Sequence, residues 1–118
     1  MREEIKIGGI DYVLNSFTFG TELEINDRSL SVDVDEQSGK VIATTKPGTV
    51  RLLTLLHSLK SWTFRGLDPT TSELVTVAEI PILDITEDTV KMLPSLHGNM
   101  LSKRAEIMNN IGGKEGKN

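Results

Sequence analysis

The amino-acid sequence predicts a small α+β protein with one or more N-terminal β-hairpins, followed by a core helix and two C-terminal helices. Three observations predict this class: residues 4–14 alternate apolar and polar around two glycines, residues 46–62 carry leucines at helical spacings, and residues 85–111 combine a helix start with a further helical pattern. With 118 residues the chain has the length of one domain and can bury a core without a metal ion or disulfide bonds. We expect that domain to span residues 1–111.

The first hairpin is expected where residues 4–14 read EIKIGGIDYVL. The two central glycines tolerate the positive φ angles of a tight two-residue turn. In this register Ile7 faces Ile10 and Ile5 faces Tyr12, so one face of the hairpin is apolar.

The segment from residue 17 to residue 45 admits two interpretations at its start. Its first part, FTFGTELEI, alternates weakly, which favours a strand, although a short helix from Thr21 to Asp27 competes with that interpretation. We favour the strand. The following SLSVDVDEQSGKVIATT predicts two strands around a turn at residues 37–40, with Val32 and Val34 on one side of the first strand.

The strongest helical pattern is KPGTVRLLTLLHSLKSW, which predicts a core helix that begins near Pro47 and ends at Trp62. Its apolar stripe is expected at the centre of the core and consists of Leu52, Leu53, Leu56 and Leu59 or Lys60. Residues 65–80 then carry turn chemistry and an alternating run, residues 74–77, that fits either one more strand or a long loop.

The stretch ITEDTVKMLPSL combines a helix start with an early stop. Thr86 is a good N-cap, and the two carboxylates that follow it favour the positive end of the helix dipole. Leu93 precedes Pro94 and is pushed out of the α region, so this helix ends there after at most two turns. Pro94 then starts the last helix, which continues to the Gly-Gly pair that opens residues 112–118. Those residues have nothing to bury and are expected to form a disordered tail.

Composition limits the classes of function. The chain has no cysteine, which excludes disulfide bonds, thiolate catalysis and cysteine-ligated zinc, and which fits a cytoplasmic protein. The net charge of −4 argues against nucleic acid or anionic membranes as main partners. The N-terminus lacks the pattern of a signal peptide, and no stretch approaches the length of a transmembrane segment. We therefore expect a cytoplasmic protein whose partners are neither nucleic acids nor membranes.

The residue pattern predicts no catalytic, cofactor or metal site. The stretch DVDEQSG is similar to the start of a calcium loop, but its glycine falls one place late and Thr44 stands where the loop needs a glutamate, so we interpret it as an acidic solvated turn. His57 and His97 have no second histidine or carboxylate at i+4, and we expect both to be partly exposed structural residues. No phosphate loop or nucleophile elbow occurs. We expect no enzyme activity and no cofactor.

The candidate functional residues are apolar and would bind a protein partner. For the two aromatic residues of SWTF we favour a role in the core, and the alternative is that they anchor a protein partner. Methionines near the last helix offer an adaptable apolar surface, with a groove for an amphipathic helix along that helix and at the Pro94 corner. The candidate partner-binding residues are Trp62, Phe64, Met92, Met100, Leu101, Ile107, Met108 and Ile111.

An ordered set of motifs spans residues 50–110. A leucine-rich helix runs into SLKSWTF, a variable insert follows, and IPILDITEDTVKMLPSL leads into the last helix. This arrangement resembles small tail-gene proteins of long-tailed bacteriophages, and the N-terminal IKIGGIDYVL is also a common opening of phage tail-region proteins. The chain departs from many of them in its longer RGLDPTTSELVTVAE segment, where they carry an Asp-Gly turn. The matching positions are Ser61, Trp62, Phe64, Pro81, Ile82, Thr86, Val90, Leu93 and Pro94.

Proteins of this kind are usually tail assembly chaperones. The resemblance implies that the chain binds the long tape-measure protein and helps tail-tube subunits polymerise around it in the host cytoplasm. Two alternatives remain open: a structural virion subunit of the tail or connector, and a small protein-binding module unrelated to phages. Such chaperones are commonly made in two forms by ribosomal slippage, and the tail dipeptides Gly113-Lys114, Gly116-Lys117 and Lys117-Asn118 are encodable by slippery codons.

Overall fold

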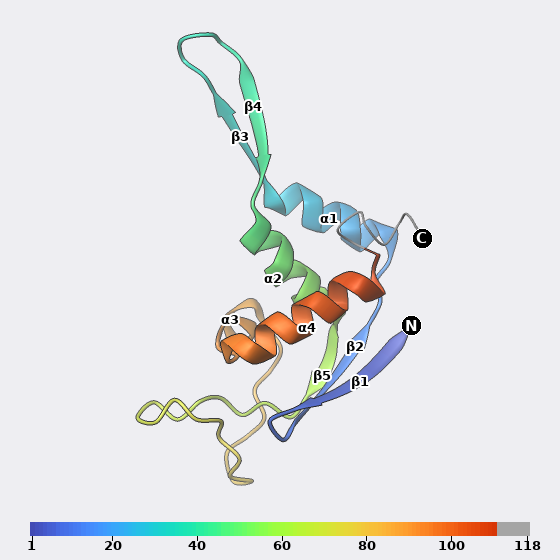
Figure 1. Ribbon diagram of the computed structural model, residues 1–118, viewed down its shortest axis with the longest axis vertical. Helices are drawn as coiled ribbons and strands as arrows, with labels where there is room; N and C mark the ends of the chain where they lie inside the picture. The colour runs from blue at the N-terminus through green and yellow to red at the C-terminus, as the bar shows by residue number, and fades with distance from the viewer. Residues whose placement is uncertain (111–118) are drawn as a thin grey trace.

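The computed structural model describes residues 1–110, which form a three-stranded sheet, a two-stranded sheet and four helices (Figure 1). The α+β class is confirmed, with N-terminal strands, a core helix and two C-terminal helices. The expectations for Ile111 and for the tail at residues 112–118 lie outside the described residues. The elements in chain order are β1 (Arg2–Ile7), β2 (Ile10–Asn15), α1 (Phe19–Ser29), β3 (Leu30–Val34), β4 (Val41–Thr45), α2 (Pro47–Ser58), β5 (Leu59–Trp62), α3 (Glu87–Lys91) and α4 (Ser95–Met108).

The first hairpin has the predicted register. Ile5 pairs with Tyr12, and Ile7 pairs with Ile10, across the antiparallel strands β1 and β2. The two turn glycines have φ angles of 56° and 81°, the left-handed pair that a two-residue type I′ turn requires. Three of the four paired apolar side chains are buried, so the apolar face predicted from the alternation forms one wall of the core.

The strand favoured at the start of residues 17–45 is wrong, because Phe19–Ser29 forms α1. The side-chain oxygen of Thr18 accepts a hydrogen bond from the Thr21 backbone N–H at 3.4 Å and so caps the helix. Ile25 is buried, and α1 packs against α2. Packing against α2 and the N-cap override the weak alternation of this segment, and the helix contains the competing interpretation of residues 21–27.

The second hairpin is confirmed as a separate two-stranded ribbon of β3 and β4 that projects away from the rest of the fold (Figure 1). At its turn, the Asp35 carboxylate accepts hydrogen bonds from the Gln37 backbone N–H at 3.0 Å and from the Ser38 hydroxyl at 2.9 Å. The hydrogen bond from Gln37, more than the one from Ser38, holds the pKa of Asp35 below its ordinary value. The carboxylate of this acidic turn is therefore engaged in fixing the turn itself.

The core helix begins at Pro47 as predicted but ends at Ser58, before the predicted end at Trp62. Leu59–Trp62 instead form β5, which pairs antiparallel with β2 and completes the sheet order β1-β2-β5. The local sequence is compatible with more helix, but pairing with β2 gives these backbone groups hydrogen-bond partners and places Trp62 opposite Tyr12.

The predicted leucine stripe is only partly correct. Leu53 and Leu55 are the most deeply buried leucines of α2, at 0% and 3% exposure. Leu52 and Leu56 are half-buried at the margin of the core, and Leu59 is buried from β5 rather than from the helix. The early end of α2 explains the case of Leu59, because residue 59 already belongs to β5.

Residues 65–80 form a loop with one isolated bridge between Leu67 and Leu74. The chain then returns to the core beside the end of β5. The Leu83 backbone N–H donates to the Phe64 carbonyl at 2.9 Å, and the Trp62 indole N–H donates to the Leu83 carbonyl at 2.7 Å. These two hydrogen bonds join the SWTF segment to the segment that begins at Pro81, which follows it only after the long loop.

The predicted corner at Pro94 is confirmed. The Thr89 backbone N–H donates to the Thr86 hydroxyl at 3.2 Å, and the Thr86 backbone N–H donates to the Thr89 hydroxyl at 2.8 Å, which makes a capping box for α3. Pro94 is the N-cap of α4. The last helix ends at Met108 rather than at the Gly-Gly pair, and Asn110 has a φ of 56°, the left-handed conformation in which helices commonly end.

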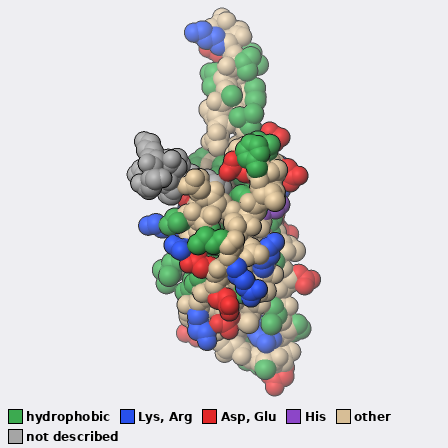
Figure 2. Space-filling model, turned by 90° about the vertical axis from the view of Figure 1, so that its right-hand side faces the viewer, with side chains coloured by type: hydrophobic (Ala, Val, Ile, Leu, Met, Phe, Trp, Pro, Cys, Tyr) green, Lys and Arg blue, Asp and Glu red, His purple; other side chains and the backbone are tan. Residues whose placement is uncertain are grey.

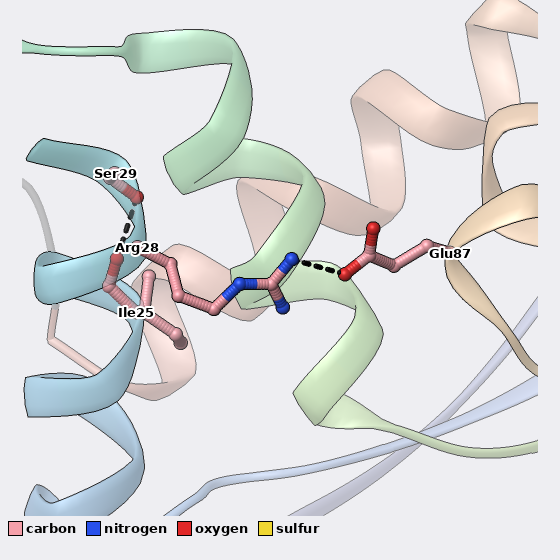
Figure 3. Close-up of polar contacts among 4 residues, drawn as sticks. All are labelled: Ile25, Arg28, Ser29 and Glu87. Atoms are coloured by element: carbon pink, nitrogen blue, oxygen red, sulfur yellow. Dashed lines mark hydrogen bonds and ion pairs between the residues drawn. The ribbon is translucent and has the colours of Figure 1, made fainter. Parts of the chain in front are cut away.

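Three hydrogen bonds connect the helices and the segments next to them. The Asn109 amide group donates to the Ser58 hydroxyl at 3.1 Å, and its oxygen accepts the Phe17 backbone N–H at 2.7 Å, so the end of α4 is joined to α2 and to the segment between β2 and α1. The Arg28 guanidinium donates to the Glu87 carboxylate at 2.6 Å and bridges α1 to α3 (Figure 3). Sequence reasoning did not single out Asn109, because its partners are far away in the chain.

Candidate partner-binding surface

The structure divides the predicted partner-binding residues between core and surface. The exposed set has exposures of 46%, 48% and 40% and consists of Met92, Met100 and Ile107. The buried set consists of Trp62, Phe64, Leu101 and Met108, none more than 9% exposed. The side chains of the buried set are packed in the core and leave a partner little surface to contact. Ile111 lies outside the described residues.

The aromatic pair of SWTF takes the core role that the sequence favoured. The Trp62 ring meets the Phe64 ring edge-on with centroids 5.2 Å apart, and it meets the Tyr12 ring edge-on at 6.4 Å. The indole N–H is satisfied by the Leu83 carbonyl. Aromatic pairs in this geometry stabilise a core beyond the area they bury, so these residues hold the sheet to the returning chain.

Helix α4 has an inner and an outer apolar face. The inner face packs into the core with Leu101, Ala105 and Met108. The outer face carries Leu96, Met100 and Ile107, which are 64%, 48% and 40% exposed and lie at i, i+4 and i+11 on one side of the helix. We call these three residues the α4 stripe. Sequence reasoning found two of them and left out Leu96.

A shallow groove lies between α2, α3 and the start of α4. It encloses about 240 Å³, and the carbon atoms of Leu52, Leu55 and Leu93 contribute to its lining. The same lining includes the cations Arg51 and Lys91. Three separate helices supply these residues, so no local sequence signal marks the groove.

A buried hydrogen bond fixes the first hairpin against the inner face of α4. The hydroxyl of Tyr12 and the Nδ1 atom of His97 are 2.8 Å apart, and both side chains are buried. Burial raises the pKa of Tyr12 to about 12, and burial also lowers the pKa of His97, so the hydrogen bond joins a neutral phenol to a neutral imidazole at neutral pH. The expectation that His97 is partly exposed is therefore wrong, although its role is structural.

The close approach of the hairpin turn to this histidine requires a glycine. A Cβ atom at Gly8 would lie 3.2 Å from the His97 ring, and the φ of this residue is positive. The turn that the sequence predicts from its two glycines thus also serves the packing of α4 on the hairpin.

Acidification is expected to destabilise the fold through His97. Because the folded-state pKa of His97 lies below its ordinary value of 6.5, the unfolded chain binds this proton more tightly. The contribution of His97 is complete above the ordinary value and is lost as the pH falls toward the folded-state pKa. Denaturant unfolding between about pH 7.5 and 5.5 measures this loss.

A matched pair of variants isolates the histidine. His97→Gln is expected to remove most of the pH dependence in that interval, whereas His57→Gln, at the half-buried histidine of α2, leaves it in place. An equal loss of pH dependence in both variants would contradict the assignment to His97.

Comparisons of the chain with protein-family models, with curated proteins and with solved structures find no match. In the described part of the chain, no cluster of three or more histidine or acidic side chains is arranged to hold a metal ion. None of the helices within residues 1–110 has the length and apolar character needed to cross a bilayer. The fold and the surface thus define a small α+β protein with an apolar stripe on its last helix.

Proposed function

We propose that this protein is a tail assembly chaperone of a long-tailed bacteriophage and that the α4 stripe binds a helical segment of the tape-measure protein. The observation that carries the proposal is the exposed apolar face of α4, with Leu96, Met100 and Ile107 at helical spacing on a helix whose other face is locked into the core. The motif resemblance between residues 50 and 110 supplies the phage context.

Six of the nine matching positions of that resemblance lie in the core or at helix starts. Trp62, Val90 and Leu93 lie in one hydrophobic cluster, Thr86 caps α3, and Pro94 caps α4. Together they fix the direction in which α4 leaves the corner. The matching residues therefore hold the helix that carries the α4 stripe. This is a reason to propose that the chain acts in the same way as the proteins that it resembles.

The proposed action follows from the physical chemistry of the partner. A tape-measure protein is long and helical, and its apolar faces are prone to aggregate before the tail is built around it. A stripe of three apolar side chains covers one face of an amphipathic helix by side-by-side packing, and the methionine adapts to different sequences. Burial of apolar surface contributes about 25 cal/mol per Å², and each contact of the stripe buries little area, so the binding is weak. The chaperone therefore releases the segment in the cytoplasm when tail-tube subunits bind to that segment instead.

Co-expression with the tape-measure protein tests this surface. The double variant Met100→Asp/Ile107→Asp is expected to leave at least about tenfold less tape-measure protein in the soluble fraction, since carboxylates in the apolar contact cost more than the 1.4 kcal/mol of a tenfold change. Circular dichroism and thermal unfolding of the variant alone should match the wild type, because both side chains are at least 40% exposed.

A matched control carries two carboxylates at equally exposed apolar positions elsewhere. Val77→Asp/Ile80→Asp lies in the loop after β5, where exposures are 52% and 41%, and is expected to solubilise the tape-measure protein like the wild type. If the stripe variant stays folded and still solubilises the partner, the proposed surface is wrong.

A second candidate function is favoured by the projecting β3-β4 ribbon. Ribbons that leave the fold commonly contact neighbouring subunits, as a structural subunit of the tail or connector requires. Mass spectrometry of purified virions separates the two functions, because a chaperone is absent from the particle and a structural subunit is present.

A slippery codon run that overlaps the next reading frame, upstream of a very long gene, would favour the chaperone. A gene neighbourhood without phage genes would favour a protein-binding module of another kind.

A further inference from the structure

The β3-β4 ribbon carries an apolar face that nothing in the described structure covers. We call residues 30–45 the arm. It projects along the long axis of the molecule (Figure 1), and hydrophobic side chains are visible along it in the space-filling view (Figure 2). In residues 1–110, neither β3 nor β4 pairs with a strand other than its partner in the arm.

The strand register sorts the arm into two different faces. Directly opposed residues lie on the same side of an antiparallel ribbon. One face therefore carries the pairs Leu30-Thr45, Val32-Ala43 and Val34-Val41, and the other carries Ser31-Thr44 and Asp33-Ile42. The first face holds no charged side chain, and Val32, Val34 and Val41 on it are 55%, 60% and 67% exposed.

Such a ribbon is not expected to remain uncovered. A two-stranded hairpin alone in water is marginally stable and needs further strands or a packed apolar face. Prolines and charged side chains usually keep exposed strands from associating with other chains. The arm contains no proline, and its charged side chains lie on the turn and on the opposite face, so its apolar face has neither feature. The apolar face is built to pack against a second surface.

We propose that the occupant is the arm of a second copy of this chain, packed face to face and antiparallel in a two-fold symmetric dimer. An uncharged flat face is self-complementary, which a two-fold interface demands. Two such ribbons stack about 10 Å apart, as sheets do in a β-sandwich. The symmetry axis passes through the central pair, Val32 and Ala43.

Charge distribution along the arm selects the antiparallel arrangement. The turn at the tip carries Asp35, Glu36 and Lys40, so a parallel pair would bring four carboxylates and only two ammonium groups together, with a net negative charge. In the antiparallel pair each tip lies over the base of the partner arm, where Lys46 precedes α2. That helix has no acidic residue in its first turn and no side-chain cap, so its positive end is available to a carboxylate of the partner.

The size of the face sets the strength of the dimer. Five residues per strand make a face only ~17 Å long, and stable complexes bury about 800 Å² per partner. We therefore expect a reversible dimer that forms with rising concentration rather than a permanent one.

Analytical ultracentrifugation of the full chain over a concentration series tests the dimer without any partner, so the result is independent of the proposed chaperone function. The wild type is expected to move from monomer to dimer. Val32→Lys/Val41→Lys is expected to raise the dissociation constant at least about a hundredfold, because it places four ammonium groups in the apolar contact. Ile42→Lys, one residue further along β4 but on the opposite face, is the matched control and should dimerise like the wild type.

Disulfide crosslinking determines the direction of the arms, since the chain has no cysteine of its own. Val32→Cys near the axis should crosslink to itself. Val34→Cys near the tip should not, but should crosslink to Leu30→Cys on a second copy. A wild type that stays monomeric, assembles beyond a dimer, or loses dimerisation equally in Ile42→Lys would overturn the proposal, and self-crosslinking of Val34→Cys would overturn the antiparallel arrangement.

Discussion

Replacing Phe64 by alanine is expected to lower the free energy of unfolding by about 3–5 kcal/mol, the largest effect of any single substitution considered for this protein. The side chain is fully buried and meets the Trp62 ring edge-on. Its removal leaves a cavity that the hydrogen bonds of Leu83 hold open, because they fix the neighbouring backbone. Denaturant unfolding at neutral pH measures the change.

The chain provides a control of the same residue type. Phe19 is 71% exposed at the start of α1, so Phe19→Ala is expected to change the free energy of unfolding by less than about 0.5 kcal/mol. A cost below about 1 kcal/mol for Phe64→Ala would contradict the core role and revive the interpretation of SWTF as a partner-binding anchor. The comparison therefore tests stability and the assignment of function together.

Replacing Leu101 by alanine is expected to lower the free energy of unfolding by about 2–5 kcal/mol, the second largest effect. This leucine has no exposed surface and points from α4 into the core shared with α2 and the first hairpin. The preceding residue, Met100, lies on the outer face at 48% exposure. Met100→Ala is expected to change the free energy by less than about 0.5 kcal/mol, because alanine has a high helix propensity and little buried area is lost.

Thermal and denaturant unfolding of both variants distinguishes the two faces of α4. Similar costs at positions 100 and 101 would mean that the helix is rotated from the orientation described above. In that case the α4 stripe would be part of the core, and the proposed binding surface would have to be abandoned. The measurement thus tests the geometry on which the proposed function depends before any partner is available.

The comparisons of Phe64 with Phe19 and of Leu101 with Met100 contrast residues that stabilise the core with residues that lie on the surface. Most of the residues that carry the phage-tail resemblance lie in the core or at helix ends, where they determine the direction of α4. The residues proposed to contact partners, on α4 and on the arm, are exposed and lie mostly outside that pattern. A motif that preserves a scaffold therefore indicates the class of protein better than it indicates the contact residues.

The elements that were predicted correctly have local signals. The first hairpin follows from alternation around Gly8-Gly9, and its register is fixed by a two-residue turn. The start of α3 follows from Thr86, and the corner follows from the steric effect of Pro94 on Leu93. The second hairpin follows from its turn residues. In each case the determining interactions lie within a few residues of one another.

The errors in the prediction occur where distant residues decide between conformations that are locally similar in energy. The segment from residue 19 to residue 29 becomes a helix that buries Ile25 and packs against α2, and residues 59–62 become a strand because β2 offers unpaired backbone groups. Burial within α4 is decided in the same way, because the helical pattern marks both Leu101 and Met100 as apolar.

What the sequence by itself determined is the set of turns, caps and helix starts, and with them the α+β class. Only the tertiary structure decided the end of the core helix, the division of the candidate residues between core and surface, and the exposure of the arm. The physical reason is the range of the interactions. Capping, turn geometry and proline sterics act between neighbours in the chain, whereas burial depends on which surfaces the folded chain brings together.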